Sequence, residues 1–227
     1  MINLVDVNKK IENEYILKNV NISFNEGYIY TLIGPNGAGK TTIISILSRL
    51  MEPDTGEVIY DQESRNVFLL LSGERNLYYK VSVKDNIYYL GTIRGLSRKQ
   101  ITENIEKYNG LFEIEHLLHK KVETLSYGQK RIVATFIGMV CGSKCIILDE
   151  VTEGLDVESK LILSRMLCEV KKDKIVILVS HDLEFIENCN DYNIFIKDGE
   201  VIEVNEQTQD LRTLYNLYIF AVVSTEL

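Results

Sequence analysis

A glycine-rich segment near the start of the chain has the residue types and spacing of a phosphate-binding loop. Residues 34–41 read GPNGAGKT, which fits the pattern G-x-x-x-x-G-K-[ST], directly after an apolar run that ends at Ile33. Glycines in such a loop let backbone N–H groups surround a phosphate, and the dipole of the following helix favours negative charge. The segment therefore predicts a nucleotide site. We expect nucleotide contacts from the loop and the first helical residues: Gly34, Pro35, Asn36, Gly37, Ala38, Gly39, Lys40, Thr41 and Thr42.

Two side chains at the end of this loop are expected to act on the phosphates and on a metal ion. The pattern places the ammonium group of Lys40 at the β- and γ-phosphates of the nucleotide, where it would support catalysis. It places the hydroxyl group of Thr41 as a ligand of Mg²⁺. The expected ligand is therefore a nucleotide bound together with Mg²⁺.

Two adjacent carboxylates much later in the chain predict the hydrolytic part of the site. Residues 146–150 read IILDE, so Asp149 and Glu150 stand at the carboxyl end of an apolar run with the character of a buried strand. Open α/β sheets bind their ligands at this end of the strands. We expect Asp149 to hold Mg²⁺, directly or through water, and Glu150 to act as the general base that polarises the attacking water.

The stretch between these two motifs indicates the kind of nucleotide site. Residues 125–129 read LSYGQ, directly before an apolar helical segment and twenty residues before Asp149. Here the sequence resembles the ABC ATPase family, whose signature is LSGGQ. The resemblance implies that Ser126, Gly128 and Gln129 contact the γ-phosphate of ATP held by an opposite subunit. Tyr127 stands where the family has its first glycine, which reduces the conformational freedom of the backbone there.

Two further segments resemble family motifs and follow in the family's order. Residues 154–156 read GLD and resemble the D-loop, which makes Asp156 an expected nucleotide contact. Residues 180–182 read SHD, after the next expected strand, and resemble the switch-histidine segment. The resemblance, which covers most of the chain, implies that His181 senses the γ-phosphate and positions the attacking water. The expected catalytic residues are thus Lys40, Glu150 and His181.

Two departures from the family pattern give predictions of their own. The family usually has a glutamine at the end of the strand near residues 67–71, but residues 72–75 read SGER. We hypothesise that Glu74 or the backbone takes over the relay of motion to a membrane partner. The adenine-stacking aromatic residue of the family corresponds to Ile11 rather than to Tyr15. We therefore expect weaker and less base-selective binding, with Tyr15 as the alternative contact if the loop is longer.

The elements that must position these motifs follow from apolar runs and capping residues. Short apolar runs predict strands, most of them buried on both faces, at residues 28–33, 67–71, 145–148, 175–179 and 192–196. Helical periodicity and starting signals predict helices at residues 39–50, 82–93, 97–108, 127–139 and 157–170. The alternation of strands and helices predicts an α/β fold with a parallel sheet.

The expected architecture is a single unit over residues 1–227, an α/β P-loop NTPase with a mostly parallel sheet as its core. The first thirty residues alternate like antiparallel strands and predict an N-terminal antiparallel β subdomain, and Asp198 and Gly199 predict a late hairpin turn. The family resemblance adds an inserted α-helical subdomain at about residues 79–140.

The composition argues against several other classes of protein. The chain has 25 Lys and Arg against 33 Asp and Glu, a net charge of −8, whereas nucleic-acid binding relies on clustered basic residues. We find no secretory signal, and no apolar stretch reaches the roughly 20 residues that span a bilayer. The four cysteines form no CxxC pair and predict free thiols. His116 and His119 are interpreted as a solvated helix face rather than as metal ligands.

The resemblance implies the ATP-hydrolysing subunit of an ABC transporter, with ATP and Mg²⁺ as ligands. Its expected partners are a transmembrane permease subunit and a second ATP-binding subunit, with no nucleic acid, at the cytoplasmic face of the membrane. Residues 73–78, GERNLY, resemble ATPases of bacterial exporters of antibiotics and peptides. Two alternatives stay open: a cytosolic ABC ATPase that remodels ribosomes or repairs DNA, and a nucleotide-binding regulator with little turnover.

Overall fold

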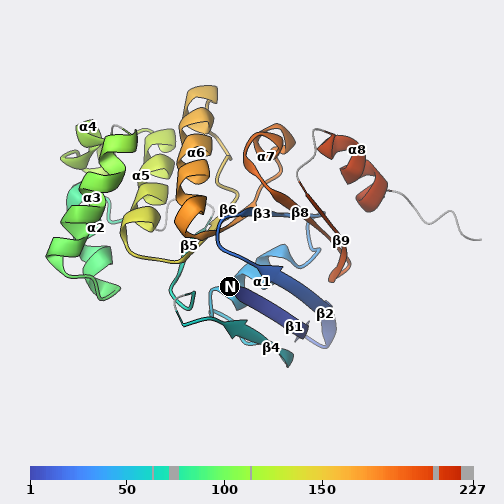
Figure 1. Cartoon of the computed structure of the whole chain (residues 1–227). Coiled ribbons are helices and arrows are strands. Elements are labelled where there is room, and N and C mark those ends of the chain that lie inside the picture. Colours follow the sequence, from blue (N-terminus) through green and yellow to red (C-terminus); the bar gives the residue numbers. More distant parts are fainter. Residues whose placement is uncertain (63, 72–76, 113, 207–209, 221–227) are drawn as a thin grey trace, which may run out of the picture.

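Two β-sheets with helix α1 between them form the centre of the molecule (Figure 1). The structure is a computed structural model, and it describes residues 1–62, 64–71, 77–112, 114–206 and 210–220. The strands are β1 (Ile2–Ile11), β2 (Glu14–Phe24), β3 (Ile29–Ile33), β4 (Thr55–Tyr60), β5 (Val67–Leu70), β6 (Cys145–Asp149), β7 (Ile175–Val179), β8 (Tyr192–Lys197) and β9 (Glu200–Glu206). The helices are α1 (Lys40–Leu47), α2 (Val83–Ile93), α3 (Arg98–Phe112), α4 (Glu115–Leu118), α5 (Tyr127–Val140), α6 (Val157–Val170), α7 (Leu183–Cys189) and α8 (Leu211–Tyr215).

The larger sheet places three functional segments side by side. Its strand order is β5-β6-β7-β3-β8-β9, and every neighbouring pair is parallel except β8 and β9. Strands β6, β7 and β3 are buried along their whole length, as expected for the middle of a parallel sheet covered on both faces. Because they are adjacent and parallel, the loops that follow them leave the sheet at the same edge.

The smaller sheet is antiparallel and covers the other side of α1. Its order is β2-β1-β4, and its inner face shares one apolar cluster with α1 and with the larger sheet. Ile43, Ile44 and Leu47 of α1 are fully buried in this cluster. The first turn of α1, which follows the glycine-rich loop, is therefore held from both sides.

Helices α2 to α5 gather beside the β5 end of the larger sheet (Figure 1). Their apolar faces share a cluster with Phe68 and Leu70 of β5. Arg94, at the end of α2, donates hydrogen bonds from Nη1 to Asn66 Oδ1 at 2.8 Å and to the carbonyl oxygen of Val67 at 3.2 Å. The helices are thereby fixed to the start of β5. The expected subdomain boundaries at residues 79–140 stay a prediction.

Most expected elements are present, but two expected helices have other ends than predicted. The predicted helix over residues 97–108 continues to Phe112 in α3. The predicted helix over residues 39–50 ends at Leu47, because Ser48 caps it and Arg49 takes a left-handed conformation with φ 61°. The hairpin between β8 and β9 is confirmed, with positive φ at Asp198 and Gly199. Strand β4 and helices α7 and α8 were not anticipated, whereas α4 lies where His116 and His119 were expected on a helix.

Three other expectations concern membrane-spanning segments, the cysteines and the segment in which the family glutamine is missing. Within them, no helix has the length and hydropathy needed to cross a bilayer. All four cysteines are free, and Cys141, Cys145 and Cys189 are buried. The segment 72–75, where the family glutamine is missing and Glu74 was considered as a relay, lies outside the described residues.

Candidate functional site

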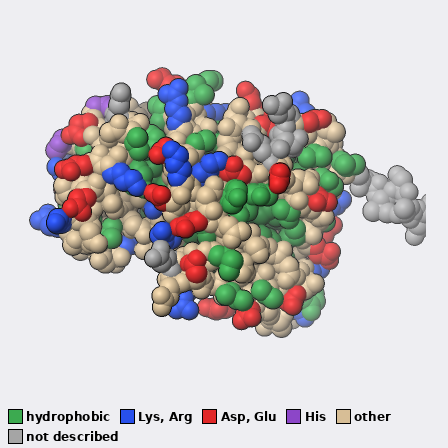
Figure 2. All heavy atoms as spheres, viewed as in Figure 1, with side chains coloured by type: hydrophobic (Ala, Val, Ile, Leu, Met, Phe, Trp, Pro, Cys, Tyr) green, Lys and Arg blue, Asp and Glu red, His purple; other side chains and the backbone are tan. Residues whose placement is uncertain are grey.

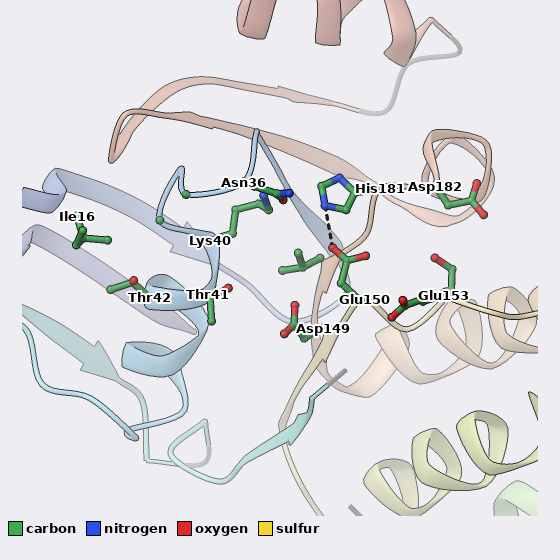
Figure 3. A pocket seen from close by; sticks show the side chains of 14 residues that line it. Ile16, Asn36, Lys40, Thr41, Thr42, Asp149, Glu150, Glu153, His181 and Asp182 are labelled. Atoms are coloured by element: carbon green, nitrogen blue, oxygen red, sulfur yellow. Dashed lines mark ion pairs between the residues drawn. The ribbon is translucent and has the colours of Figure 1, made fainter. Parts of the chain in front are cut away.

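A cavity of about 770 Å³ opens at the carboxyl edge of β3, β6 and β7 (Figure 3). The glycine-rich loop and α1 form one wall, and the segments after β6 and β7 form the other. The residues that line it are Ile16, Asn36, Gly37, Gly39, Lys40, Thr41, Thr42, Asp149, Glu150, Thr152, Glu153, Val179, His181 and Asp182.

The glycine-rich loop has the shape that its sequence predicts. Gly37 and Gly39 have φ of 81° and 104°, values that side-chain-bearing residues rarely adopt. Gly34 packs directly on β8, since a Cβ atom there would lie 2.2 Å from the carbonyl oxygen of Ile196. Helix α1 begins at Lys40 without a side-chain cap, so its first N–H groups stay available for an anion.

Lys40 is the cation of this cavity. Its side chain is largely buried, and Nζ donates hydrogen bonds to the carbonyl oxygens of Gly34 at 2.7 Å and Pro35 at 2.9 Å. Burial lowers the pKa of the ammonium group, while the nearby carboxylates Glu150 and Asp149 act in the opposite direction. Gly34 and Pro35 thus accept hydrogen bonds from the lysine rather than line the cavity, and Ala38 of the same loop is buried and does not line it either.

Asp149 and Glu150 face the loop from the end of β6 (Figure 3). Burial raises the pKa of the Asp149 carboxyl, although Lys40 favours its ionised form. Burial also raises the pKa of Glu150, and His181 acts in the opposite direction when it is protonated. Glu150 has a left-handed backbone with φ 49°, a conformation that costs on the order of 1 kcal/mol or more in a residue with a side chain. Its N–H group donates to the carbonyl oxygen of Val179 at 2.8 Å, which fixes this turn beside β7.

The segments after β6 and β7 are joined by polar contacts around His181. The Nε2 atom of His181 lies 3.2 Å from Oε1 of Glu150 (Figure 3). The buried hydroxyl groups of Thr152 and Ser180 are 2.7 Å apart. Asp182 caps α7 and forms an ion pair with Lys160 of α6. Sequence reasoning missed the roles of Thr152 and Lys160, because contacts between distant loops leave no local pattern.

The signature residues lie outside this cavity. Ser126 is exposed at the start of α5, where its Oγ accepts a hydrogen bond from the Gln129 N–H at 3.2 Å and Gln129 Oε1 accepts one from the Ser126 N–H at 3.1 Å. Gly128 is buried against α6, and Asp156 caps α6 by accepting from the Ser159 N–H at 2.7 Å. A single chain therefore brings together Lys40, Thr41, Asp149, Glu150 and His181, and leaves Ser126, Gly128, Gln129 and Asp156 apart from them.

The residue of the β1–β2 hairpin that lines the cavity is neither of the two considered from the sequence as base contacts. Ile16 of β2 lines the cavity, whereas Ile11 and Tyr15 do not. Ile11 lies at the tip of the β1–β2 hairpin, and Tyr15 is half exposed with the ammonium group of Lys10 4.2 Å from its ring centre. The hairpin contains register shifts, so the residue that reaches the cavity could not be counted from the sequence.

The parallel sheet, the glycine-rich loop before α1 and the paired carboxylates after β6 define a P-loop nucleoside triphosphatase. Comparison with protein families shows which family of P-loop nucleoside triphosphatases this chain belongs to. The model of the ABC transporter family matches residues 17–153. The chain belongs to this family, and it is an ATP-binding and ATP-hydrolysing subunit.

Individual relatives agree with this assignment. The chain is 31% identical to the lantibiotic transport ATP-binding protein SrtF of Streptococcus pyogenes, across 95% of this chain and 96% of that protein. It is 28% identical to the ABC transporter ATP-binding protein NatA of Bacillus subtilis, across 89% of this chain and 88% of that protein. A solved dimeric structure of a bacterial ABC transporter cassette is 25% identical with a TM-score of 0.75, covering 92% of this chain and 99% of that chain.

Proposed function

We propose that this chain powers an exporter of peptides or antibiotics, as one of two ATP-binding subunits attached to a separate transmembrane permease at the cytoplasmic face of the membrane. The observation that carries the proposal is the division of the site. The cavity gathers Lys40, Glu150 and His181, but the signature residue Ser126 is exposed elsewhere on the same chain. A complete site then needs Ser126 from a second subunit.

The residues of the cavity fit MgATP. Thr41 and Asp149 offer a hydroxyl and a carboxylate oxygen on opposite walls of one cavity, the oxygen ligands that Mg²⁺ prefers. Among the described residues, no group of three or more His, Cys, Asp or Glu side chains could hold a metal ion alone. Mg²⁺ in nucleotide sites commonly uses one or two protein ligands together with phosphate oxygens. When bound, the ion would neutralise charge on the phosphates.

The side chains around the cavity have distinct tasks in this proposal. The N–H groups at the start of α1 and the ammonium group of Lys40 bind the phosphates. Glu150 accepts a proton from the attacking water as general base, and its left-handed backbone holds the carboxylate at the end of β6. His181 contacts Glu150 and orients it. These roles follow the positions of the residues around one cavity.

A pair of subunits would place each phosphate-binding loop opposite the other chain's signature. Ser126 at the start of α5 and Asp156 at the start of α6 are both exposed and could make such a contact. The similar bacterial cassette is dimeric in its solved structure. Dimer closure around ATP would then drive the permease, and hydrolysis would reopen the pair.

The permease is proposed to dock on the aromatic segment beside α2. Tyr78 and Tyr89 are half exposed, and their rings meet edge to face with centroids 4.9 Å apart. Exposed aromatic side chains in contact are common at the centre of protein interfaces. The likeness to the lantibiotic transport protein SrtF over nearly the whole chain supports peptide export. Residues 73–76 of the motif at residues 73–78 that suggested this branch lie outside the described residues.

The surface charge supports a protein partner rather than nucleic acid. On the face shown in Figure 2, Lys and Arg side chains are interspersed with Asp and Glu and form no continuous basic track. The net charge of −8 also disfavours binding to the negatively charged backbone of nucleic acid. This weakens the alternative of a ribosome- or DNA-associated ATPase.

Affinity purification of the tagged full chain from its native membranes tests the proposal. We expect a multi-spanning membrane protein to co-purify, and ATP hydrolysis by the complex to exceed that of the isolated chain. Replacement of both tyrosines, Tyr78→Ala with Tyr89→Ala, should release the membrane protein while ATP binding persists. Tyr28→Ala, a half-exposed tyrosine in another aromatic cluster, is the matched control. Recovery of ribosomal particles or DNA instead would reject transport.

A further inference from the structure

Tyr127, which replaces a glycine of the family signature, contacts its own chain rather than only solvent. Its hydroxyl oxygen accepts hydrogen bonds from Arg131 Nε at 3.2 Å and from Arg131 Nη2 at 2.9 Å. The Arg131 guanidinium carbon lies 5.3 Å from the tyrosine ring centre. On its other side the ring lies close to Gly154, where an added Cβ atom would come within 3.2 Å of Tyr127 Cε1. The ring therefore fills the space between α5 and residues 154–156.

Arg131 connects this contact to the end of β5. The residue is 2% exposed, and its Nη1 atom donates a hydrogen bond to the carbonyl oxygen of Leu71 at 2.9 Å. Within the described part of the chain, no carboxylate forms an ion pair with Arg131. A buried charge is costly unless its donors are satisfied, and the planar guanidinium reaches Tyr127 and Leu71 at once. A lysine could not make both sets of contacts in the same geometry.

A second contact joins the same two segments one residue further along. A Cβ atom added at Gly128 would lie 2.5 Å from Ser159 Oγ and 3.7 Å from Leu155 Cδ2. The start of α5 thus rests directly on the first turn of α6, and Asp156 caps that turn through the Ser159 N–H group. Ser126 and Asp156 are therefore held at a fixed spacing by packing within one chain.

We infer that Tyr127 and Arg131 are positioning residues. They hold Ser126, residues 154–156 and the end of β5 in a fixed relative position, and this group of segments contacts the ATP bound to a second copy of this chain. The inference rests on the proposed function, because it requires a facing copy. Neither side chain touches the chain's own nucleotide cavity. Their loss should consequently alter the closing of the pair and leave the first binding of ATP to the loop at Lys40 intact.

The test compares ATP binding with ATP-driven dimerisation in the full chain carrying Glu150→Gln, which slows hydrolysis. Tyr127→Phe removes only the hydroxyl acceptor. Arg131→Lys keeps the positive charge but loses the planar guanidinium group with its several N–H donors. Arg94→Lys is the matched control, since Arg94 holds the opposite end of β5 through the Val67 carbonyl oxygen and lies far from the signature in sequence. Sedimentation gives the dimer dissociation constant, equilibrium binding gives the ATP affinity, and thermal unfolding gives Tm.

We expect Tyr127→Phe and Arg131→Lys to raise the dimer dissociation constant about tenfold, which corresponds to about 1.4 kcal/mol. ATP affinity should change by less than about twofold, because neither side chain lines the cavity and both variants keep the positive charge of Arg131 that acts on Asp149. Arg94→Lys should lower Tm without changing dimerisation. If Arg131→Lys and Arg94→Lys lower Tm alike and both dimerise like the parent, the positioning role is wrong while the proposed function stands. If the Glu150→Gln parent stays monomeric with ATP, the two-subunit site and this inference are both rejected.

Discussion

His181 Nε2 and Glu150 Oε1 meet 3.2 Å apart, although their side chains follow two different strands of the sheet. Burial of the carboxyl raises the pKa of Glu150, and His181, when it carries a proton, opposes that rise. A general base must be ionised to accept a proton. The histidine therefore affects the pH range in which Glu150 can act.

The first prediction concerns the pH profile. His181→Gln removes a side chain that lowers the pKa of Glu150 when it is protonated, so the acid limb of kcat/KM for ATP should move to higher pH, in addition to any loss of rate. Measurement of kcat/KM across the acid and neutral pH range checks the shift. His119→Gln, an exposed histidine that does not line the cavity, is the control. An unmoved acid limb in His181→Gln would show that the ion pair has no such effect.

The second prediction concerns the general base itself. Glu150→Gln should reduce steady-state phosphate release by about 10² to 10⁴-fold, the usual contribution of a general base. ATP binding should persist, because the groups proposed to bind the phosphates, the start of α1 and Lys40, lie on the other wall of the cavity. Glu153→Gln changes an exposed carboxylate of the same cavity and should retain most activity. Equal rates for the Glu150 variant and the parent would require another base.

The third prediction is a gain of stability at neutral pH in Asp149→Asn. Burial raises the pKa of Asp149 above its unfolded value of about 3.9. The folded state therefore binds this proton more tightly, so the stabilising contribution is complete below about pH 3.9 and is lost as pH rises through the raised value. The variant should have a higher Tm than the parent at neutral pH, and the difference should vanish in acid.

Asp156→Asn should show the opposite pH dependence of stability in the same experiment. The backbone N–H group of Ser159 lowers the pKa of Asp156, so its contribution is present above about pH 3.9 and is lost as pH falls. Thermal unfolding of both variants by circular dichroism, from acid to neutral pH, compares them directly. Parallel pH trends in the two variants would contradict the assigned environments.

The fourth prediction tests the packing of α5 on α6. Gly128→Ala places a methyl group 2.5 Å from Ser159 Oγ and should cost about 1–3 kcal/mol of unfolding free energy, as overpacking usually does. Ser159→Ala, which removes that oxygen, should recover part of the loss in the double variant. Gly110→Ala in α3 meets no atom within 4 Å and should stabilise slightly. Denaturant unfolding measures these four variants and the parent, and simple additivity of the Gly128 and Ser159 changes would exclude the contact.

The fifth prediction concerns the nucleotide base. Ile16 lines the cavity and Tyr15 does not, so Ile16→Ala should weaken ATP affinity more than Tyr15→Ala does. Because an aliphatic side chain offers no aromatic stacking, GTP should bind with an affinity close to that of ATP. Competition binding with ATP and GTP checks both statements. A large loss confined to Tyr15→Ala would instead place the base against the tyrosine ring.

The phosphate loop and the paired carboxylates could be predicted because their signals are local. Glycine spacing fixes the loop around Lys40, and an apolar run fixes the strand before Asp149. The order β6-β7-β3 then brings them together. The end of α1 was misplaced, since Arg49 adopts a left-handed conformation that no sequence pattern marks.

The surroundings of the signature could not be predicted for a different reason. Tyr127 reads as a departure from a glycine motif, yet its partners Gly154 and Leu71 lie far away in the sequence. Contacts of this kind depend on which helix covers which part of the sheet. The same holds for Ile16, whose approach to the cavity depends on register shifts in the β1–β2 hairpin.

Strand β5 is fastened at both ends by arginines from the helical layer, Arg94 at the Val67 carbonyl and Arg131 at the Leu71 carbonyl. A force on α2 or α5 therefore reaches the sheet through two side chains as well as through the connecting backbone. Two attachment points on one short strand resist rotation as well as sliding. A displacement of these helices should therefore rotate the β5 edge of the sheet together with them, rather than slide the helices along the strand.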